Sequence, residues 1–272
     1  MLTATIPSTS LIHFDYATSC KLLLPSSDSI CLALVGCGGN GSWLAPSMAR
    51  IARLLIEKFH KEIDLHFIDP DRVEAKNVYR QNFCQAEIGR SKADTLAYRY
   101  GLAWGVEIDA WEKPLKDVGY FSSGTTLFVG CVDRASARRE IHERVSGRPA
   151  TWWLDCGNEK SSGQVCLGSG ARKPDDPFQL PGFCSWLPLP SAQYPELLEE
   201  EQLSVSGEGR SCAEMALQDS KGLAINQRMA AEATDYLARL LVTRDLQKMA
   251  TSIDLASGAA RSVYITKEAV LK

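Results

Sequence analysis

A cluster of glycines near the start of the chain is the first group of residues that could do chemistry. The segment Val35-Gly36-Cys37-Gly38-Gly39-Asn40-Gly41 lies between a continuous apolar run and a stretch whose apolar residues have helical spacing. Glycines at such a turn allow a tight backbone and let N–H groups approach a phosphate, and the helix start adds partial positive charge. The candidates for nucleotide binding are Gly36, Gly38, Gly39, Asn40 and Gly41.

The glycine turn alone leaves three interpretations open. It fits a dinucleotide oxidoreductase, an enzyme that uses a triphosphate, or a strand-to-helix turn that binds nothing. In dinucleotide oxidoreductases the acid that holds the ribose comes about 20 residues after the glycines. Here the candidate acid, Asp69, comes 28 residues after Gly41.

Polar and basic residues are concentrated behind Asp69. They are Asn77, Arg80, Gln81 and Lys92. A hydride-transfer enzyme has no use for this set, whereas an enzyme that handles a triphosphate needs it. Arg offers a planar fork for phosphate oxygens, and Lys offers a point charge. The set therefore favours a triphosphate such as ATP.

Two further carboxylates could hold Mg²⁺, which prefers carboxylate and phosphate oxygens. These are Asp71 and Asp133. Asp71 could instead cap the turn that follows it.

Short apolar runs alternate with helical stretches from residue 30 onward. The expected strands are Ile30–Val35, Ile63–Ile68, Val106–Trp111, Thr126–Val132 and Thr151–Asp155, and the expected helices are Ser42–Phe59, Gly89–Tyr100, Ala135–Val145 and Gly222–Leu241. This alternation is typical of an α/β fold with a doubly wound, mainly parallel sheet. Because the carboxyl ends of parallel strands meet at one edge, Gly36, Asp69 and Asp133 are expected to converge there.

The remaining segments complete the expected domain organisation. Residues 1–29 are rich in Thr and Ser and are expected to form an N-terminal arm or an edge segment, and residues 30–272 are expected to form one domain. Within it, residues 169–211 are rich in proline and are expected to form a long loop, which is usually functional in a compact domain. The tail Ser252–Thr266 alternates enough to supply one or two closing strands.

The composition disfavours several classes of protein. The 272 residues carry a formal net charge of −3, whereas nucleic-acid binding usually needs a clustered basic surface. No apolar run approaches the roughly 20 residues that span a bilayer, and no signal peptide is visible, so a cytoplasmic protein is expected. The nine cysteines contain no Cys-x-x-Cys pair, which indicates reduced thiols and argues against a zinc knuckle.

The ordered motifs resemble those of the ThiF/MoeB/HesA superfamily, which includes the ubiquitin-activating enzymes. The resemblance covers about Ile30–Leu241. The family's Asp-Asn-x-x-x-Arg segment matches only in part, because its Asn is replaced. The matching residues are the glycine motif, Asp69 with Asp71, Asn77 with Arg80 and Gln81, Gly89 with Lys92 and Ala93, and Asp133-Arg134 with Arg138.

This resemblance implies a Rossmann-like fold with a crossover loop insertion, and an enzyme that uses ATP and Mg²⁺ without zinc. Asp69 would hold the ribose hydroxyls, and Arg80 and Lys92 would grip the phosphates. Asn77 would line the phosphate pocket, and Asp133 would bind Mg²⁺. The carboxylate of a C-terminal glycine, on a ubiquitin-like or sulfur-carrier protein, would attack the α-phosphate and give an acyl-adenylate and pyrophosphate.

Many members of the superfamily also carry a cysteine near a crossover loop that takes over the activated acyl group. The segment Ser211-Cys212-Ala213-Glu214 resembles that position, although Met215 replaces a small residue. Cys212 is therefore the first candidate nucleophile and Cys184 the second, and a chain without a catalytic cysteine is the third possibility. Proximity to Arg210 and to a helix start would lower the pKa of the Cys212 thiol.

The resemblance implies a homodimer, and the finer placement is with bacterial ThiF-type proteins such as those of PRTRC gene clusters. Many family dimers supply a phosphate-contacting Arg from the N-terminal arm, but no Arg precedes Arg50. Either Lys21 or an Arg from elsewhere replaces it, or the site works without one. Three alternatives stay open. The same site could activate a small molecule, a peptide terminus or a tRNA base; the chain could be a non-catalytic scaffold; or it could be an NAD-type oxidoreductase.

Overall fold

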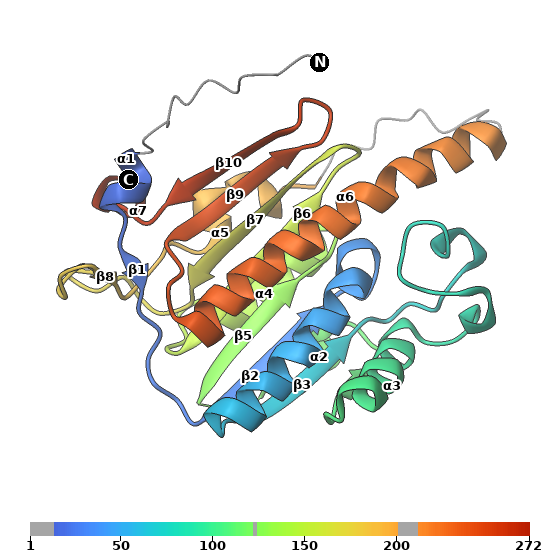
Figure 1. Ribbon diagram of the computed structural model, residues 1–272, viewed down its shortest axis with the longest axis horizontal. Coiled ribbons are helices and arrows are strands. Elements are labelled where there is room, and N and C mark those ends of the chain that lie inside the picture. Colours follow the sequence, from blue (N-terminus) through green and yellow to red (C-terminus); the bar gives the residue numbers. More distant parts are fainter. Residues whose placement is uncertain (1–13, 122–123, 201–211) are drawn as a thin grey trace, which may run out of the picture.

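An eight-stranded sheet runs through the molecule in the order β10-β9-β7-β6-β5-β2-β3-β4 (Figure 1). The computed structural model describes residues 14–121, 124–200 and 212–272. The strands are β2 (Ser29–Val35), β3 (Glu62–Ile68), β4 (Asp109–Trp111), β5 (Thr125–Gly130), β6 (Thr151–Asn158), β7 (Ser162–Ser169), β9 (Lys248–Asp254) and β10 (Ala259–Tyr264). Five neighbouring strands are parallel, namely β4, β3, β2, β5 and β6. The strands β7, β9 and β10 continue the sheet in antiparallel pairing.

The strand order reverses at β2. From β2 the chain proceeds to β3 and β4 on one side, and then returns to β5 and β6 on the other side. In open α/β sheets the crevice at such a reversal, outside the carboxyl ends of the strands, is where ligands bind. The predicted doubly wound sheet is confirmed, and its reversal lies between β2 and β5.

Helices cover both faces of the sheet. One face carries α2 (Gly39–Phe59), α3 (Lys92–Trp104) and α6 (Cys212–Ala238), and the opposite face carries α4 (Ala135–Val145). Successive residues of β2 show this arrangement, because Leu32 and Leu34 pack with the α2 face while Ala33 packs with the α4 face. A strand buried on both faces has to be apolar throughout, as the sequence of β2 is.

Three parts of the chain described below differ from the expected elements. β7 was not predicted, because its sequence is diluted by Ser162, Gly163 and Gly168, and glycine and serine carry little strand propensity. The closing strands were predicted as Ser252–Thr266, and they are β9 and β10, which begin four residues earlier at Lys248. The predicted helix Gly222–Leu241 is the later part of α6 together with a turn of π-helix, η5 (Arg239–Thr243).

The segment before β2 is tied to the rest of the domain. It contains α1 (Phe14–Thr18) and β1 (Lys21–Leu22), and β1 pairs in parallel with β8 (Phe183–Cys184). The backbone N–H of Leu22 donates to the carbonyl of Leu246, and the Leu22 side chain is buried. The described part of this segment, residues 14–28, therefore contacts the domain through a small two-stranded sheet of β1 and β8.

The long connection between β7 and α6 first packs with the α2 face, through Phe178, Cys184 and Leu187, and then reaches the α4 face at Leu189 and Leu198. It contains β8, the short helix α5 (Pro190–Gln193) and the 3-10 turn η4 (Pro195–Leu198). The guanidinium of Arg139 on α4 donates to the carbonyl of Leu198 at 2.8 and 3.0 Å. The helix that follows this connection, α6, packs on the opposite face of the sheet.

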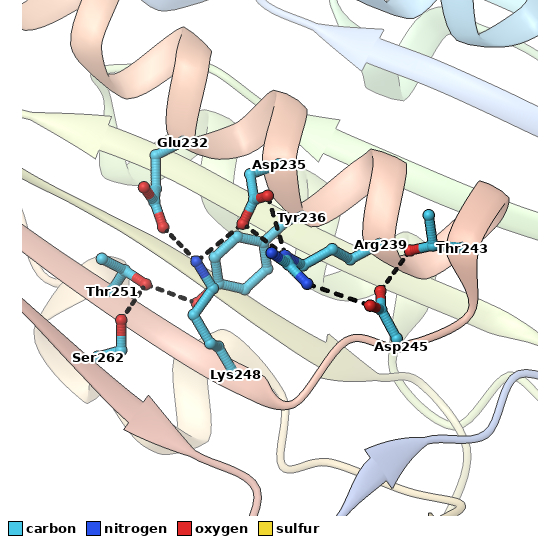
Figure 2. A network of polar contacts seen from close by, with 9 residues as sticks. All are labelled: Glu232, Asp235, Tyr236, Arg239, Thr243, Asp245, Lys248, Thr251 and Ser262. Atoms are coloured by element: carbon cyan, nitrogen blue, oxygen red, sulfur yellow. Dashed lines mark hydrogen bonds and ion pairs between the residues drawn. The ribbon is translucent and has the colours of Figure 1, made fainter. Parts of the chain in front are cut away.

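A network of ion pairs joins the end of α6 to β9 (Figure 2). The Nζ of Lys248 lies 2.7 Å from Glu232 and 3.0 Å from Asp235. Arg239 contacts Asp235 at 2.9 Å and Asp245 at 3.2 Å. Burial lowers the pKa of Lys248, but the two carboxylates outweigh burial and leave its pKa raised.

Hydroxyl groups extend this network to β10. The hydroxyl of the buried Tyr236 lies 2.9 Å from Oγ1 of Thr251, which in turn lies 3.0 Å from Oγ of Ser262. Each charged group of the network therefore has a partner within the chain.

Among the described helices, none is long and apolar enough to cross a membrane.

Candidate nucleotide-binding site

The glycine turn predicted between β2 and α2 is present, and its two outer glycines are needed by the backbone. Gly36 has a φ of 91°, and a Cβ there would lie 2.5 Å from the carbonyl oxygen of Cys131. A Cβ on Gly41 would lie 1.9 Å from the carbonyl oxygen of Gly36. These two positions close the turn tightly and hold it against the end of β5.

The two inner glycines differ from each other. A Cβ on Gly39 would lie 2.9 Å from the side-chain amide of Asn226 on α6. A Cβ on Gly38 would meet only Nε2 of Gln81, at an ordinary 3.7 Å. Of the four glycines, Gly38 is therefore the one whose missing side chain leaves space that the described chain does not fill.

The start of α2 is open to an anion. Its N-cap is Gly38, no side chain caps it, and its first turn contains no acidic residue. The first N–H groups of a helix have no partner within the helix, and they carry partial positive charge. A phosphate is the ligand that such a helix start receives best.

Asp69, at the carboxyl end of β3, holds the glycine turn in place. Its Oδ2 accepts the backbone N–H of Cys37 at 2.6 Å, and its Oδ1 accepts the N–H of Asp71 at 2.8 Å. Burial raises the pKa of Asp69, and the nearby ammonium of Lys92 partly offsets that rise. Each carboxylate oxygen keeps a further lone pair for a hydroxyl donor.

Lys92 lies beside this carboxylate at the first position of α3. Its side chain is buried, and its Nζ lies 3.1 Å from Oδ2 of the exposed Asp71. The backbone N–H of Lys92 also donates to the carbonyl of Asp71 at 3.0 Å. The predicted Asp69, Asp71 and Lys92 are thus brought together, and they place one buried cation next to the turn.

Arg80 lies on a segment that is fastened to the helices around the turn. Its carbonyl accepts two bonds of 3.1 Å, from Nε1 of Trp43 on α2 and from Nδ2 of Asn226 on α6. Two residues later, Nδ2 of Asn82 donates to the carbonyl of Ser42 at 3.2 Å. That carbonyl lacks its usual helical donor because residue 46 is a proline.

Asn77 and Gln81 are both buried, and they play different parts in this segment. The Oδ1 of Asn77 accepts the backbone N–H of Glu74 at 2.9 Å and closes the 3-10 turn η1 (Ala75–Asn77). Gln81 lies with its Nε2 near Gly38, and its Oε1 has no partner in the described chain. Gln81 therefore offers a buried amide beside the open glycine.

The carboxyl end of β5 supplies the third predicted group. Asp133 is exposed, and its carbonyl accepts Nη1 of Arg138 at 3.4 Å. Arg138 also contacts Asp155 at the end of β6, with Nε 3.3 Å from Oδ1. Burial raises the pKa of Asp155 to about 6, although Arg138 pulls it down. The convergence of Gly36, Asp69 and Asp133 on one edge follows from the strand order.

The residues present fit a nucleotide. Three buried side-chain oxygens at this edge have no partner in the described chain, namely Asn40 Oδ1, Gln81 Oε1 and Asp155 Oδ2. Buried polar atoms are almost always bonded, so a ligand or water is expected to complete them. Asn40 is fixed from its other end, because its Nδ2 donates to the carbonyl of Cys156 at 2.9 Å.

Within the described residues, no group of three or more His, Cys, Asp or Glu side chains gathers as a metal cage. Asp133 is therefore a single exposed carboxylate. This donor set suits Mg²⁺, which is usually held by one or two carboxylates together with phosphate oxygens and water.

The candidate cysteines lie in different settings. Cys184 is fully buried, its thiol donates to the carbonyl of Trp186 at 2.9 Å, and burial raises its pKa to about 11. A neutral, buried thiol is a poor nucleophile, so the structure disfavours the second candidate. Cys212 is the first residue of α6, and its side chain lies outside the described residues. Cys37 and Cys156 are buried, as expected of structural thiols.

Sequence reasoning did not single out several residues that position the site. They are Ser42, Trp43, Asn82 and Asn226. The first three adjoin recognised motifs, so their proximity was available as a signal. Asn226 lies 146 residues beyond Arg80, and its only local signal is a polar residue on the buried side of a helix.

Comparisons with known proteins agree with this geometry. The sequence profile of the ThiF family matches residues 27–175. No curated protein is significantly similar in sequence. Among solved structures, PaaA superposes with a TM-score of 0.55 at 19% identity, over 87% of this chain and 64% of PaaA.

Structures of E. coli MccB are also similar. MccB with AMPCPP and MccA gives a TM-score of 0.53 at 12% identity, over 86% of this chain and 63% of MccB. MccB with ATP gives a TM-score of 0.54 at 13% identity, with the same coverage. At these identities the likeness shows the fold, and the chain spans slightly less than two thirds of the length of either protein.

Proposed function

Because the chain belongs to the ThiF family, we propose that it binds ATP with Mg²⁺ and adenylates a carboxylate. The observation that carries this proposal is the pinned glycine turn. Asp69 holds the turn through the N–H of Cys37, and the uncapped start of α2 and the buried Lys92 lie beside it. The structures of E. coli MccB with ATP and with AMPCPP support a nucleotide as the ligand.

Each residue has a role that follows from its charge and place. The free lone pairs of Asp69 accept the ribose hydroxyls. Lys92, Arg80 and the start of α2 hold phosphate oxygens, and the amide of Gln81 completes the pocket beside Gly38. Asp133 holds Mg²⁺, which neutralises phosphate charge. Asn77 shapes the segment that carries Arg80, because its own oxygen closes η1.

In the proposed reaction, an oxygen of the substrate carboxylate attacks the α-phosphorus of ATP. The new P–O bond forms as the bond to the leaving pyrophosphate breaks, and an acyl-adenylate results. Two anions must approach each other in this step. The site therefore has to supply fixed positive charge before the reaction begins, and Lys92, Arg80 and the start of α2 supply it.

The substrate that we propose is the C-terminal glycine of a ubiquitin-like or sulfur-carrier protein. The thiolate of Cys212 would then attack the carbonyl carbon of the acyl-adenylate and form a thioester as AMP leaves. A homodimeric, cytoplasmic enzyme, close to the ThiF-type proteins of PRTRC gene clusters, belongs to this proposal. The structures of E. coli MccB with MccA support a site that receives a second molecule beside the nucleotide. A small-molecule, peptide or tRNA-linked carboxylate is the alternative substrate.

The test is ATP–pyrophosphate exchange, measured with and without a candidate carboxylate partner. Exchange that depends on the partner is expected from the wild-type chain. Asp133→Ala and Arg80→Ala are each expected to lower it at least about 100-fold, as loss of a group that stabilises transition-state charge does. Wild-type exchange in either variant would remove the assigned role of that residue, and absence of exchange with every carboxylate class would favour a non-catalytic scaffold.

A further inference from the structure

Asn226 on α6 contacts two parts of the candidate site at once. It is buried, and its Nδ2 donates to the carbonyl of Arg80 at 3.1 Å. Its amide group also lies over the backbone of Gly39. The nearest three atoms to a Cβ built on Gly39 would be Nδ2, Oδ1 and Cγ of Asn226, at 2.9, 2.9 and 3.0 Å.

This contact explains the glycine at position 39. Gly39 begins α2, and its φ is not among the positive values of the chain, so backbone conformation does not require glycine there. The missing side chain makes room for Asn226. Gly39 is then a packing glycine, and Gly38 is the glycine left to face the nucleotide.

The same helix touches Arg80 a second time. A Cβ on Gly222 would lie 3.6 Å from Cδ of Arg80, so the backbone of α6 runs along the aliphatic part of that side chain. Gly222 lies one helical turn before Asn226. One face of α6 therefore borders both the backbone and the side chain of the residue assigned to the phosphates.

We propose that Asn226 is a positioning residue of the nucleotide site, which fixes the start of α2 and the backbone of Arg80 against one helix. This inference rests on the proposed ATP function. Because α6 begins at Cys212, the same helix would connect the phosphate pocket to the candidate nucleophile. Asn226 itself touches neither the carboxylate nor the reacting phosphorus.

The first part of the test needs no nucleotide. Gly39→Ala is expected to lower the melting temperature by roughly 2–10 °C, because an added methyl meets a packed amide. Asn226→Ala in the same chain is expected to restore most of that loss. Asn226→Ala alone should change the melting temperature little, because Trp43 still donates to the carbonyl of Arg80. A double variant as unstable as Gly39→Ala would overturn the packing between these residues.

The second part measures MgATP affinity by titration calorimetry on the full chain. Asn226→Ala is expected to weaken binding by about 2- to 10-fold, the worth of one hydrogen bond that orients a ligand residue. Gln227→Ala, a change at the next and exposed residue of α6, is the matched control and should bind as the wild type does. Unchanged affinity in Asn226→Ala would overturn the positioning role.

The two proposals fail in different ways. If the wild-type chain does not bind MgATP, the proposed function is wrong, and the thermal measurements still decide whether Asn226 occupies the space over Gly39. If the wild type binds and Asn226→Ala binds equally well, the proposed function stands and the inference about Asn226 is wrong.

Discussion

The middle of α6 and its C-terminal end lie in opposite chemical settings. Toward its C-terminus, Glu232 and Asp235 pair with Lys248, and Arg239 joins Asp235 to Asp245, so every charge has a partner (Figure 2). Near its middle, at Gly222 and Asn226, the helix borders the glycine turn and Arg80. At that edge of the sheet three buried oxygens, on Asn40, Gln81 and Asp155, have no partner in the described chain. The first setting joins α6 to β9, and the second is the setting of the proposed nucleotide site.

An unpartnered atom alone does not locate a site. Thr125, Trp152 and Trp153 also contain buried polar atoms without partners, and they belong to β5 and β6. The glycine edge differs because unpartnered oxygens, an uncapped helix start and a buried cation occur together there. This combination separates a binding site from ordinary imperfections of a core.

Among the substitutions that test this difference, Gly41→Ala is expected to change stability and ATP binding most. The new methyl would lie 1.9 Å from the carbonyl oxygen of Gly36, which cannot move aside. We expect the free energy of unfolding to fall by at least about 3 kcal/mol and ATP binding to be lost. Chemical denaturation and calorimetry measure the two losses. Gly119→Ala is the control, because nothing lies within 4 Å of the added atom. A stable, ATP-binding Gly41→Ala protein would contradict the described turn.

The next effect concerns Asp155 and pH. Its pKa rises on folding from 3.8 to about 6, so the folded chain holds a proton that the unfolded chain has released. This group therefore lowers stability as pH rises from about 4 to above 6, by about 3 kcal/mol in total. Asp155→Asn should lack that pH dependence, so its stability relative to wild type should improve between pH 4 and pH 7. If the stabilities of the wild type and Asp155→Asn changed with pH in the same way, a raised pKa of Asp155 in the folded chain would be contradicted.

A smaller loss of stability is expected from a substitution at the C-terminal end of α6. Lys248→Met leaves Glu232 without its cation, while Asp235 keeps its contact with Arg239. We expect a loss of about 1–2 kcal/mol in the free energy of unfolding with unchanged MgATP affinity. Lys272→Met, which breaks only an exposed pair with Glu268, should change stability by less than about 0.5 kcal/mol. Weaker nucleotide binding in Lys248→Met would show that the ion pairs of Lys248 also affect the nucleotide site.

The sequence predicts the parts of the site that depend on local rules. Gly36, Asp69 and Asp133 each follow a strand, and parallel strands end at one edge, so their convergence could be expected. Asp69 with Asp71 and Lys92 were predicted from two separate motifs, and the contact of Lys92 with Asp71 was not predicted. The structure adds that Asp69 binds the glycine turn itself, a role that no spacing rule reveals.

The rest depends on packing between distant segments. Asn226 meets Arg80 across 146 residues of sequence, and no periodicity indicates which buried polar residue of α6 will do so. Gly39 was assigned to the nucleotide because it stands in the glycine motif, yet α6 occupies the space beside it. β7 was missed because tertiary pairing with β6 and β9 overrides its weak strand propensity.

Calorimetric titration of the full chain with MgATP tests the central claim most directly. The wild type is expected to bind one ATP per chain, Asp69→Ala to lose at least about 10-fold in affinity because the glycine turn loses its anchor, and Lys248→Met to bind as the wild type does. Failure of the wild type to bind ATP, or equal binding by Asp69→Ala, would contradict a nucleotide site built on the turn between Gly36 and Gly41.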